Sequence, residues 1–485
     1  MITSKVVNLQ RPWSVSKAAF VWLAVVFLIA FIFFAITTEQ NLPVMLPIMV
    51  TVSGTIFFAW ILWLRQQTVP IFEIGTVYVA VVSVYTLYPL VSYLMNGLTY
   101  FPFNDNRLLN AQPTPPEIGV IGWHYVVHSV SFMGMYLIIR GRLPRPKIHF
   151  PTPDHTTLGV LVFFYLTIHL FFLLLDSAFN TSARTYLESY LAFGRLPFGI
   201  AQLASLLGGA RFTITLAIFT VLFHNYVKYR LVIFAWLVWM TLTTVVHLEG
   251  RTEFILVLFS AIILYHFLVR PIPLWRVGLA GLAGLSFFII LGLMRMGWFF
   301  SESGTGYNIF SYANEFELIF GNAYDLRQLL SNGAIGQLPP GFHVPDLVIM
   351  IPRQLLPFEK ITPAEWYVNT FYPIYAAQGG GLAFGTISES ILGMGWLDLV
   401  ARGAMLGFLL AQIHRYFTLR RSSFWMFVLN IWLMTQIYNC FRHTTFFPLY
   451  LFFYRFLWVA LGVQGVCILL KGSIKGYHRS LLQYK

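Results

Sequence analysis

The stretch "KAAFVWLAVVFLIAFIFFAI" (Lys17–Ile36) decides the class of fold, because every side chain after the first lysine is apolar. A helix needs about 18–20 such residues to cross the hydrocarbon core of a bilayer. The run is longer than the apolar core of a signal peptide, and no small-residue cleavage site follows it. We therefore expect residues 17–36 to form a membrane-spanning helix.

Runs of this kind recur along all 485 residues, of which 58% are hydrophobic and only 10% are charged. A soluble domain carries about 25% charged residues, so this apolar surface requires a lipid bilayer. The sequence predicts an all-α polytopic integral membrane protein, with residues 1–485 forming a single membrane domain. We expect about twelve spans, at 17–37, 43–64, 72–95, 117–139, 156–176, 199–226, 231–248, 251–269, 277–296, 385–414, 423–440 and 446–470.

The formal net charge of +13 has a simple explanation in a membrane protein. Lysine and arginine accumulate in cytoplasmic loops, so the charge does not indicate a nucleic-acid partner. If the N-terminus is cytoplasmic, every second loop is basic, including those after 64, 139 and 414. The even number of spans then places both termini in the cytoplasm.

Three segments on the opposite, outer side exceed a simple turn: 97–116, 177–198 and the large loop 297–384. Long loops inside a compact protein are usually functional or disordered, and the aromatic and proline content of the large loop favours order. It contains "NEFELIFGNAYDLRQLL" (Asn314–Leu330), which has a helical pattern. In one interpretation the charged residues of this helix are simply its solvated face.

Several arginines near the outer face are not explained by the charge bias of the loops. Arg251, in "HLEGRTEFIL", opens the eighth span, where the free N–H groups of a helix start and a guanidinium together suit a phosphate. The alternatives are an arginine that reaches the lipid headgroups or one that bonds Glu249. The other arginines on or near the outer face that the charge bias leaves unexplained include Arg211, Arg295, Arg327 and Arg353.

Two residues are candidates for proton transfer. His343 lies between prolines in the large loop, where an imidazole is either a general base or a structural histidine. Glu389 follows the glycines of "QGGGLAFGTISESILGMGWLDL" near the outer end of the tenth span, and a carboxylate in a partly apolar setting can take a proton from a hydroxyl. No metal cluster or nucleotide fingerprint is visible, so neither a metal nor a cofactor is expected.

Charged and polar residues inside the spans are expected to have structural partners. Asp398 and Arg402 are four residues apart and should pair on one helix face. His124 and His128 have the same spacing without an acidic or cysteine ligand nearby, so we expect both to face the helix bundle. Arg455 is expected to serve the packing of the bundle.

The sequence resembles the O-antigen polymerases (Wzy type), also called oligosaccharide repeat unit polymerases, over roughly residues 200–415. The resemblance rests on "GRTEFILVLFSAIILYHFLVR" (Gly250–Arg270), "IPRQLLPFEKITP" (Ile351–Pro363) and "GGGLAFGTISESILGMGWLDLVARGAMLGFLL" (Gly379–Leu410). It implies a GT-C-like membrane fold in the bacterial inner membrane with a periplasmic active site. It also implies metal-independent glycosyl transfer between polyprenyl-diphosphate-linked oligosaccharides, donor and acceptor alike.

On this resemblance, Arg251 and Arg353 would bind the diphosphate, with Arg211, Arg295 and Arg327 as further candidates, and Glu389 or His343 would activate the acceptor hydroxyl. A chain-length regulator and a flippase are the expected protein partners. An O-antigen ligase, with the same chemistry and a lipid A-core acceptor, is the nearest alternative. A flippase or transporter is the alternative from another class, although no internal repeat is visible.

Overall fold

The computed structural model describes residues 39–66, 71–96, 113–143, 155–179, 196–247, 251–273, 315–338, 360–373, 383–419 and 423–483, with shorter pieces within 276–286 and 345–358 and at 376. All regular elements in this part of the chain are helices, and it contains no strand. The first expected span, 17–37, and most of the ninth, 277–296, lie outside the described residues.

The chain forms two compact units, each assembled from segments that are distant in sequence. Unit 1 comprises 1–147, 296–420 and 436–448, and unit 2 comprises 148–295, 421–435 and 449–485. The described helices of unit 1 are η1 (Glu39–Asn41), α2 (Leu42–Gln66), α3 (Ile74–Asn96), α5 (Pro115–Arg140), α12 (Glu315–Ser331), α14 (Pro363–Phe371), α16 (Gly385–Leu392), α17 (Trp396–Leu419) and α19 (Asn439–Arg442).

The helices of unit 2 include two π-helices, η2 and η5. They are α6 (His155–Phe179), α8 (Phe198–His224), α9 (Tyr226–His247), α10 (Arg251–Leu264), η2 (Tyr265–Val269), η5 (Phe452–Leu457) and α21 (Trp458–Gln483), together with α18 (Phe424–Gln436), of which all but the last residue belongs to this unit. A short helix, α20 (Phe447–Leu451), precedes η5.

Six helices are long and apolar enough to cross a membrane among the residues described. They are Leu42–Gln66, Ile74–Met95, His155–Phe179, Gly199–His224, Trp396–Leu419 and Phe447–Lys471. This agrees with an all-α membrane protein. The twelve expected spans, the GT-C-like fold and the single membrane domain stay predictions.

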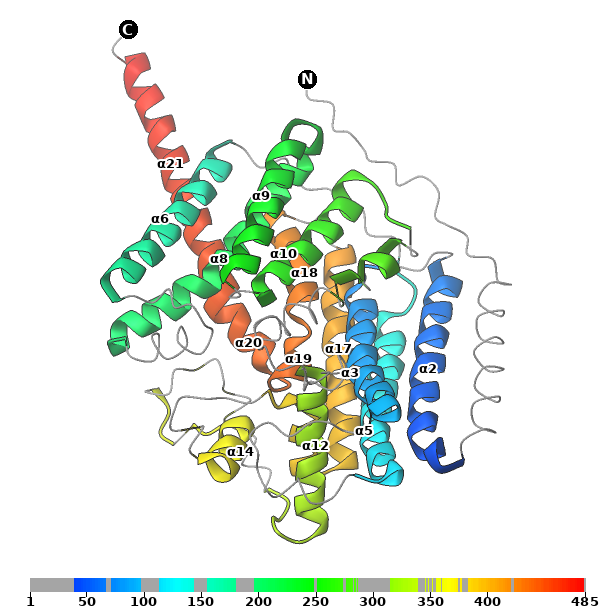
Figure 1. Cartoon of the computed structure of the whole chain (residues 1–485). Helices are drawn as coiled ribbons and strands as arrows, with labels where there is room; N and C mark the ends of the chain where they lie inside the picture. Colours follow the sequence, from blue (N-terminus) through cyan, green and yellow to red (C-terminus); the bar gives the residue numbers. More distant parts are fainter. Residues whose placement is uncertain are drawn as a thin grey trace. The chain divides into compact units, whose positions relative to one another are not determined.

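In unit 1, α2 and α17 run parallel to α5 and pack against it (Figure 1). Near the start of α5, its His124 ring stacks on Trp396 at the start of α17, with ring centroids 3.9 Å apart. Near its end, the carbonyl of Ile139 accepts a hydrogen bond from Arg415 at 3.2 Å. His124 and His128 are both buried, which confirms that they face the bundle.

Glycines allow α17 to touch the backbone of α5. A Cβ atom at Gly403 would lie 2.4 Å from the carbonyl oxygen of His128, and one at Gly407 would lie 2.5 Å from that of Phe132. Small residues four apart permit this close approach between membrane helices, which gain stability from packing rather than from the hydrophobic effect. The sequence "GAMLG" (Gly403–Gly407) therefore fixes how α5 and α17 cross.

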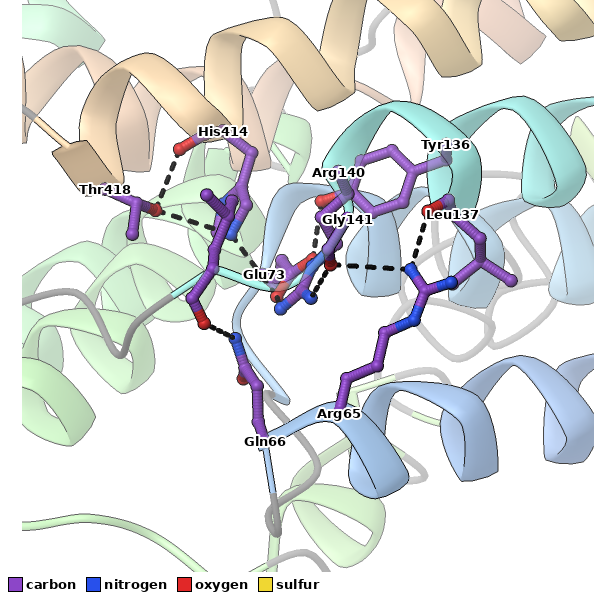
Figure 2. A network of polar contacts seen from close by, with 10 residues as sticks. Arg65, Gln66, Glu73, Tyr136, Leu137, Arg140, Gly141, His414 and Thr418 are labelled. Atoms are coloured by element: carbon purple, nitrogen blue, oxygen red, sulfur yellow. Dashed lines mark hydrogen bonds and ion pairs between the residues drawn. The ribbon is translucent and has the colours of Figure 1, made fainter.

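A buried ion pair ties the other end of these helices together (Figure 2). Glu73, one residue before α3, accepts hydrogen bonds from Nη2 of Arg140 at 2.7 Å and from the Tyr136 hydroxyl at 2.6 Å. His414 of α17 lies 3.4 Å from the same carboxylate. Burial alone would raise the pKa of Glu73, but His414 and Arg140 outweigh it and lower that pKa.

In unit 2, α8 packs against α6, α9, α10 and η5. A Cβ atom at Gly209 would lie 2.6 Å from Cγ of Arg455, and the Thr213 hydroxyl donates to the Arg455 carbonyl at 2.6 Å. Arg455 therefore contributes to packing, as expected. Residues two apart on a helix point in different directions, so Arg211 does not share the face that carries Gly209 and Thr213.

The expected tenth span, 385–414, is not one helix. The chain turns at 393–395 and separates the buried α16 from α17, with Gly395 at φ +61° and its N–H donating to the Ser390 carbonyl at 2.9 Å. A positive φ disfavours any residue with a Cβ atom, and "GMG" supplies a glycine at that position. The helix that is long and apolar enough to cross a membrane is Trp396–Leu419, so the expected start of the span at 385 is wrong and residues 385–392 form a separate helix.

Candidate functional site: a buried ion-pair cluster on α16 and α17

Helix α16 is anchored at its start by backbone contacts with α19. The amides of Phe384 and Gly385 donate to the carbonyls of Arg442 at 3.0 Å and His443 at 2.6 Å. Gly385 has φ +85°, and a Cβ atom there would lie 2.6 Å from the carbonyl oxygen of Phe441. Only glycine satisfies both the left-handed conformation and this close approach.

Glu389 lies at the centre of α16, and its side chain is completely buried. Its Oε2 atom accepts hydrogen bonds from the Thr445 amide at 3.0 Å and the Thr445 hydroxyl at 2.7 Å. Nη1 of Arg402 forms an ion pair with the same oxygen at 2.8 Å. These contacts join α16 to α17 and to the segment that follows α19.

Arg402 also binds a second carboxylate. Its Nε atom donates to Oδ2 of Asp398 at 3.0 Å, which confirms the pairing expected from their spacing. Its Nη1 atom donates to the Thr445 hydroxyl at 2.8 Å, and that hydroxyl is 2.6 Å from the hydroxyl of Thr386. A threonine hydroxyl has one donor and two acceptor sites, so the bonds to Glu389, Arg402 and Thr386 use all three.

The cluster combines two carboxylates with one guanidinium. All three side chains are nearly inaccessible, with exposed fractions of 0% for Glu389, 8% for Arg402 and 11% for Asp398. An uncompensated charge in such surroundings is very costly, and Arg402 compensates both acids. We define Glu389, Asp398, Arg402, Thr386 and Thr445 as the α16–α17 cluster.

The large loop supplies α12, the helix expected at Asn314–Leu330, and α12 packs against α16, α3 and α5. Its acids do not form a solvated face, so that interpretation is wrong. Glu317 and Asp325 are buried. Ser92 of α3 donates to Glu317, and Glu315 lies 3.3 Å from Nε of Arg442.

The second helix of the loop, α14, is fixed to α12 through a buried tyrosine. The Tyr367 hydroxyl donates to Oδ2 of Asp325 at 2.5 Å, and the Asn322 side chain donates to the Ala383 carbonyl at 2.6 Å. Burial, followed by the charge of Asp325, raises the pKa of Tyr367 well above its ordinary value. Tyr367 therefore remains a donor, and α14, α12 and the start of α16 form one packed structure.

The predicted site residues are distributed over both units. Glu389 belongs to the α16–α17 cluster, and Arg327 lies on α12. Arg211 lies near the middle of α8 in unit 2, and Arg251 is the first residue of α10, with its side chain outside the described part. His343, Arg353 and Arg295 also lie outside the described residues.

Sequence reasoning missed the partners of Glu389. The spacing of four residues predicts the pair of Arg402 with Asp398, whereas Glu389 lies thirteen residues before Arg402 and on the other side of a glycine turn. Thr445 comes from a different part of the chain. The only available signal was the occurrence of an arginine within a span, which usually indicates a buried partner or a wet cavity.

No family model matches the chain, and no curated protein or solved structure matches it. The described helices define the class of protein as an all-α membrane protein. In the described residues, no group of three or more metal-ligating side chains converges.

Proposed function

We propose that the chain is a glycosyltransferase that polymerises polyprenyl-diphosphate-linked oligosaccharide repeat units into a surface polysaccharide at the periplasmic face of the bacterial inner membrane. The proposal starts from the sequence resemblance to O-antigen polymerases. The observation that carries it further is the buried α16–α17 cluster, because α16, which carries Glu389, packs against α12 of the large loop.

The position of the helix break supports surface chemistry over transport. Transporters commonly bind their substrates where helices are interrupted near the bilayer midplane. Here α17, at 24 residues, is long enough to cross the membrane alone, and the turn at 393–395 comes just before its first residue. A break at the end of a span, rather than within it, favours a reaction near the membrane surface.

The proposed chemistry uses arginines in place of a metal. Transfer of a sugar from a polyprenyl diphosphate leaves negative charge on the departing diphosphate, which guanidinium groups stabilise through charge-assisted hydrogen bonds. We assign this role to Arg251 and Arg353, with Arg211, Arg295 and Arg327 as further candidates. Glu389 or His343 would accept the proton of the acceptor hydroxyl.

A gene deletion separates the proposed activity from its alternatives. Loss of a polymerase leaves single repeats on the lipid A-core, whereas loss of an O-antigen ligase leaves none. A flippase deletion also leaves none, and a flippase does not lengthen the glycan when it is purified. Purified protein should therefore elongate lipid-linked repeats in detergent without added metal or nucleotide; failure to do so with active substrate would contradict the proposal.

Substitution of single arginines tests the diphosphate assignment in the same assay. Arg251→Ala and Arg353→Ala should each shorten the polymer or abolish it. The matched control is Arg276→Ala, which removes an arginine from an expected cytoplasmic loop. If both variants made polymer of normal length, the arginines would have another role.

A further inference from the structure

We infer that Arg402 is a positioning residue that orients the Glu389 carboxylate for proton transfer, and that Asp398 holds Arg402 in place. This inference rests on the proposed function, because it assigns to Glu389 the role of general base. The sequence pattern alone assigned Arg402 to a structural pair with Asp398.

The argument begins with the geometry of the guanidinium. Its Nη1 atom contacts Glu389 Oε2 at 2.8 Å and its Nε atom contacts Asp398 Oδ2 at 3.0 Å. Guanidinium is planar and rigid, so two contacts through different nitrogen atoms fix both carboxylates relative to it. An ammonium group is a point charge on a flexible stem and fixes neither. The position of Glu389 is thus set by α17, which carries both Arg402 and Asp398.

The second step concerns the charge of Glu389. A carboxylate accepts a proton only when it is ionised, and burial without a compensating charge favours its neutral form. Arg402 supplies that charge, and the amide and hydroxyl of Thr445 donate to the same oxygen. Glu389 can therefore be an ionised carboxylate in a site that excludes water.

The third step compares this cluster with the ion pair at the opposite end of α5. Glu73 and Arg140 are equally buried, with exposed side-chain fractions of 2% and 0%. They lie at the end that carries the expected cytoplasmic loops. Both clusters contribute to folding, but only the α16–α17 cluster lies beside the helices of the large loop, where the proposed reaction takes place.

Other charged groups on neighbouring elements share the surroundings of Glu389. α12 carries Glu315, Glu317, Asp325 and Arg327, α19 carries Arg442, and α5 carries His128. Substitution of Arg402 leaves all of these unchanged, so a change in pH dependence reports the loss of the Arg402 contacts.

The experiment measures the rate of repeat transfer against pH for purified variants. The substrate is a preparation of lipid-linked repeats extracted from cells that lack this chain. Rates are divided by the amount of folded protein, determined by size-exclusion chromatography. The variants are Glu389→Gln, Arg402→Gln, Arg402→Lys and Asp398→Asn, and the matched control is Glu73→Gln.

Glu389→Gln should lower kcat by about 100-fold or more, the usual contribution of a general base. Arg402→Gln should move the acidic limb of the pH–rate profile upward by about one pH unit or more, because Glu389 loses its opposite charge. Arg402→Lys should largely restore the position of the acidic limb, because the positive charge is kept. Its kcat should remain reduced, because a lysine cannot contact both carboxylates through two fixed nitrogen atoms. Asp398→Asn should lower kcat without a comparable change in KM, and Glu73→Gln should leave both kcat and the limb unchanged per folded molecule.

Each failure has a different meaning. If wild-type protein does not elongate the repeats, the proposed function is wrong. If Glu389→Gln retains full activity, Glu389 is not the base and the inference falls, while polymerisation itself stands. If Glu389→Gln is inactive but Arg402→Gln keeps the wild-type acidic limb, Arg402 does not position Glu389. If Arg402→Gln does not fold, Arg402→Lys decides: a wild-type kcat and profile in that variant overturn the inference.

Discussion

A Cβ atom at Gly403 would lie 2.4 Å from the carbonyl oxygen of His128, so α17 rests directly on the backbone of α5. The neighbour is backbone rather than a flexible side chain, and it cannot move without displacing the helix. This contact lies between the two buried ion clusters along α17 and sets the spacing on which both depend.

Gly403→Ala should therefore destabilise the protein by about 1–3 kcal/mol, the usual cost of forcing extra atoms into a packed core. The measurement is the thermal unfolding midpoint of purified protein in detergent. Gly134→Ala is the matched control on α5, where an added Cβ atom meets nothing within 4 Å. Alanine is also the better helix former, so Gly134→Ala should be neutral or slightly stabilising. Equal midpoints for the two variants would contradict the proposed contact.

Gly385→Ala should lower the free energy of unfolding by more than the cost of a left-handed conformation alone. At Gly385 the substitution meets both φ +85° and the Phe441 carbonyl at 2.6 Å, whereas Gly333 has φ +69° with open space around it. The left-handed conformation costs a non-glycine residue about 1–2 kcal/mol. Gly333→Ala should show that cost only, and Gly385→Ala should in addition displace α16 and reduce repeat transfer. A smaller loss of stability for Gly385→Ala than for Gly333→Ala would refute this reading of the start of α16.

The ion pair of Glu73 and Arg140 should make stability depend on pH. The folded state lowers the pKa of Glu73, because His414 and Arg140 outweigh the effect of burial. The stabilisation is therefore complete above the ordinary glutamate pKa of about 4.3 and is lost as the pH falls through the lower, folded-state value. Unfolding midpoints should drop on acidification in the wild type. The drop should be smaller in Glu73→Gln, and an identical profile in both proteins would exclude the assignment.

Arg140→Gln should be more harmful at neutral pH than a surface substitution, because it leaves a buried carboxylate with less compensation. Removal of one member of a buried pair typically costs about 3–5 kcal/mol. The same unfolding assay measures it, with Arg142→Gln, an exposed arginine two residues later, as the control. Comparable midpoints for the two variants would show that the contacts in Figure 2 contribute little.

The sidedness of the membrane can be tested with single cysteines at the two ends of unit 1. Both native cysteines, Cys440 and Cys467, are buried, so background labelling should be low. Asn332→Cys lies just beyond α12, and Arg142→Cys lies just beyond α5; both positions are exposed. A maleimide that cannot cross the inner membrane should label Asn332→Cys in cells with a permeable outer membrane. It should label Arg142→Cys only after the inner membrane is opened. Labelling of both from the same side would overturn the expected topology.

The sequence by itself determined the class of fold. The length of an apolar run and the charge of the flanking loops are local properties, and they are enough to predict which segments enter a bilayer. The sequence also located α12 and the pairing of Asp398 with Arg402, both of which follow from helical periodicity within one segment. The sequence did not predict the turn at 393–395, because a glycine in an apolar run is compatible with a continuous helix. The start of α16 depends on the close approach of Gly385 to the Phe441 carbonyl, which joins two distant segments of the chain.

The tertiary structure alone decided which charges meet. Arg402 reaches Glu389 across a turn and Thr445 across 43 residues, and Glu73 meets Arg140 across 67. Such partners are chosen by the way helices cross, and the crossing of α5 and α17 depends on glycines whose role is invisible without the facing carbonyl groups. The sequence could place charged residues at one end of the membrane helices. Only packing could show that they are buried together.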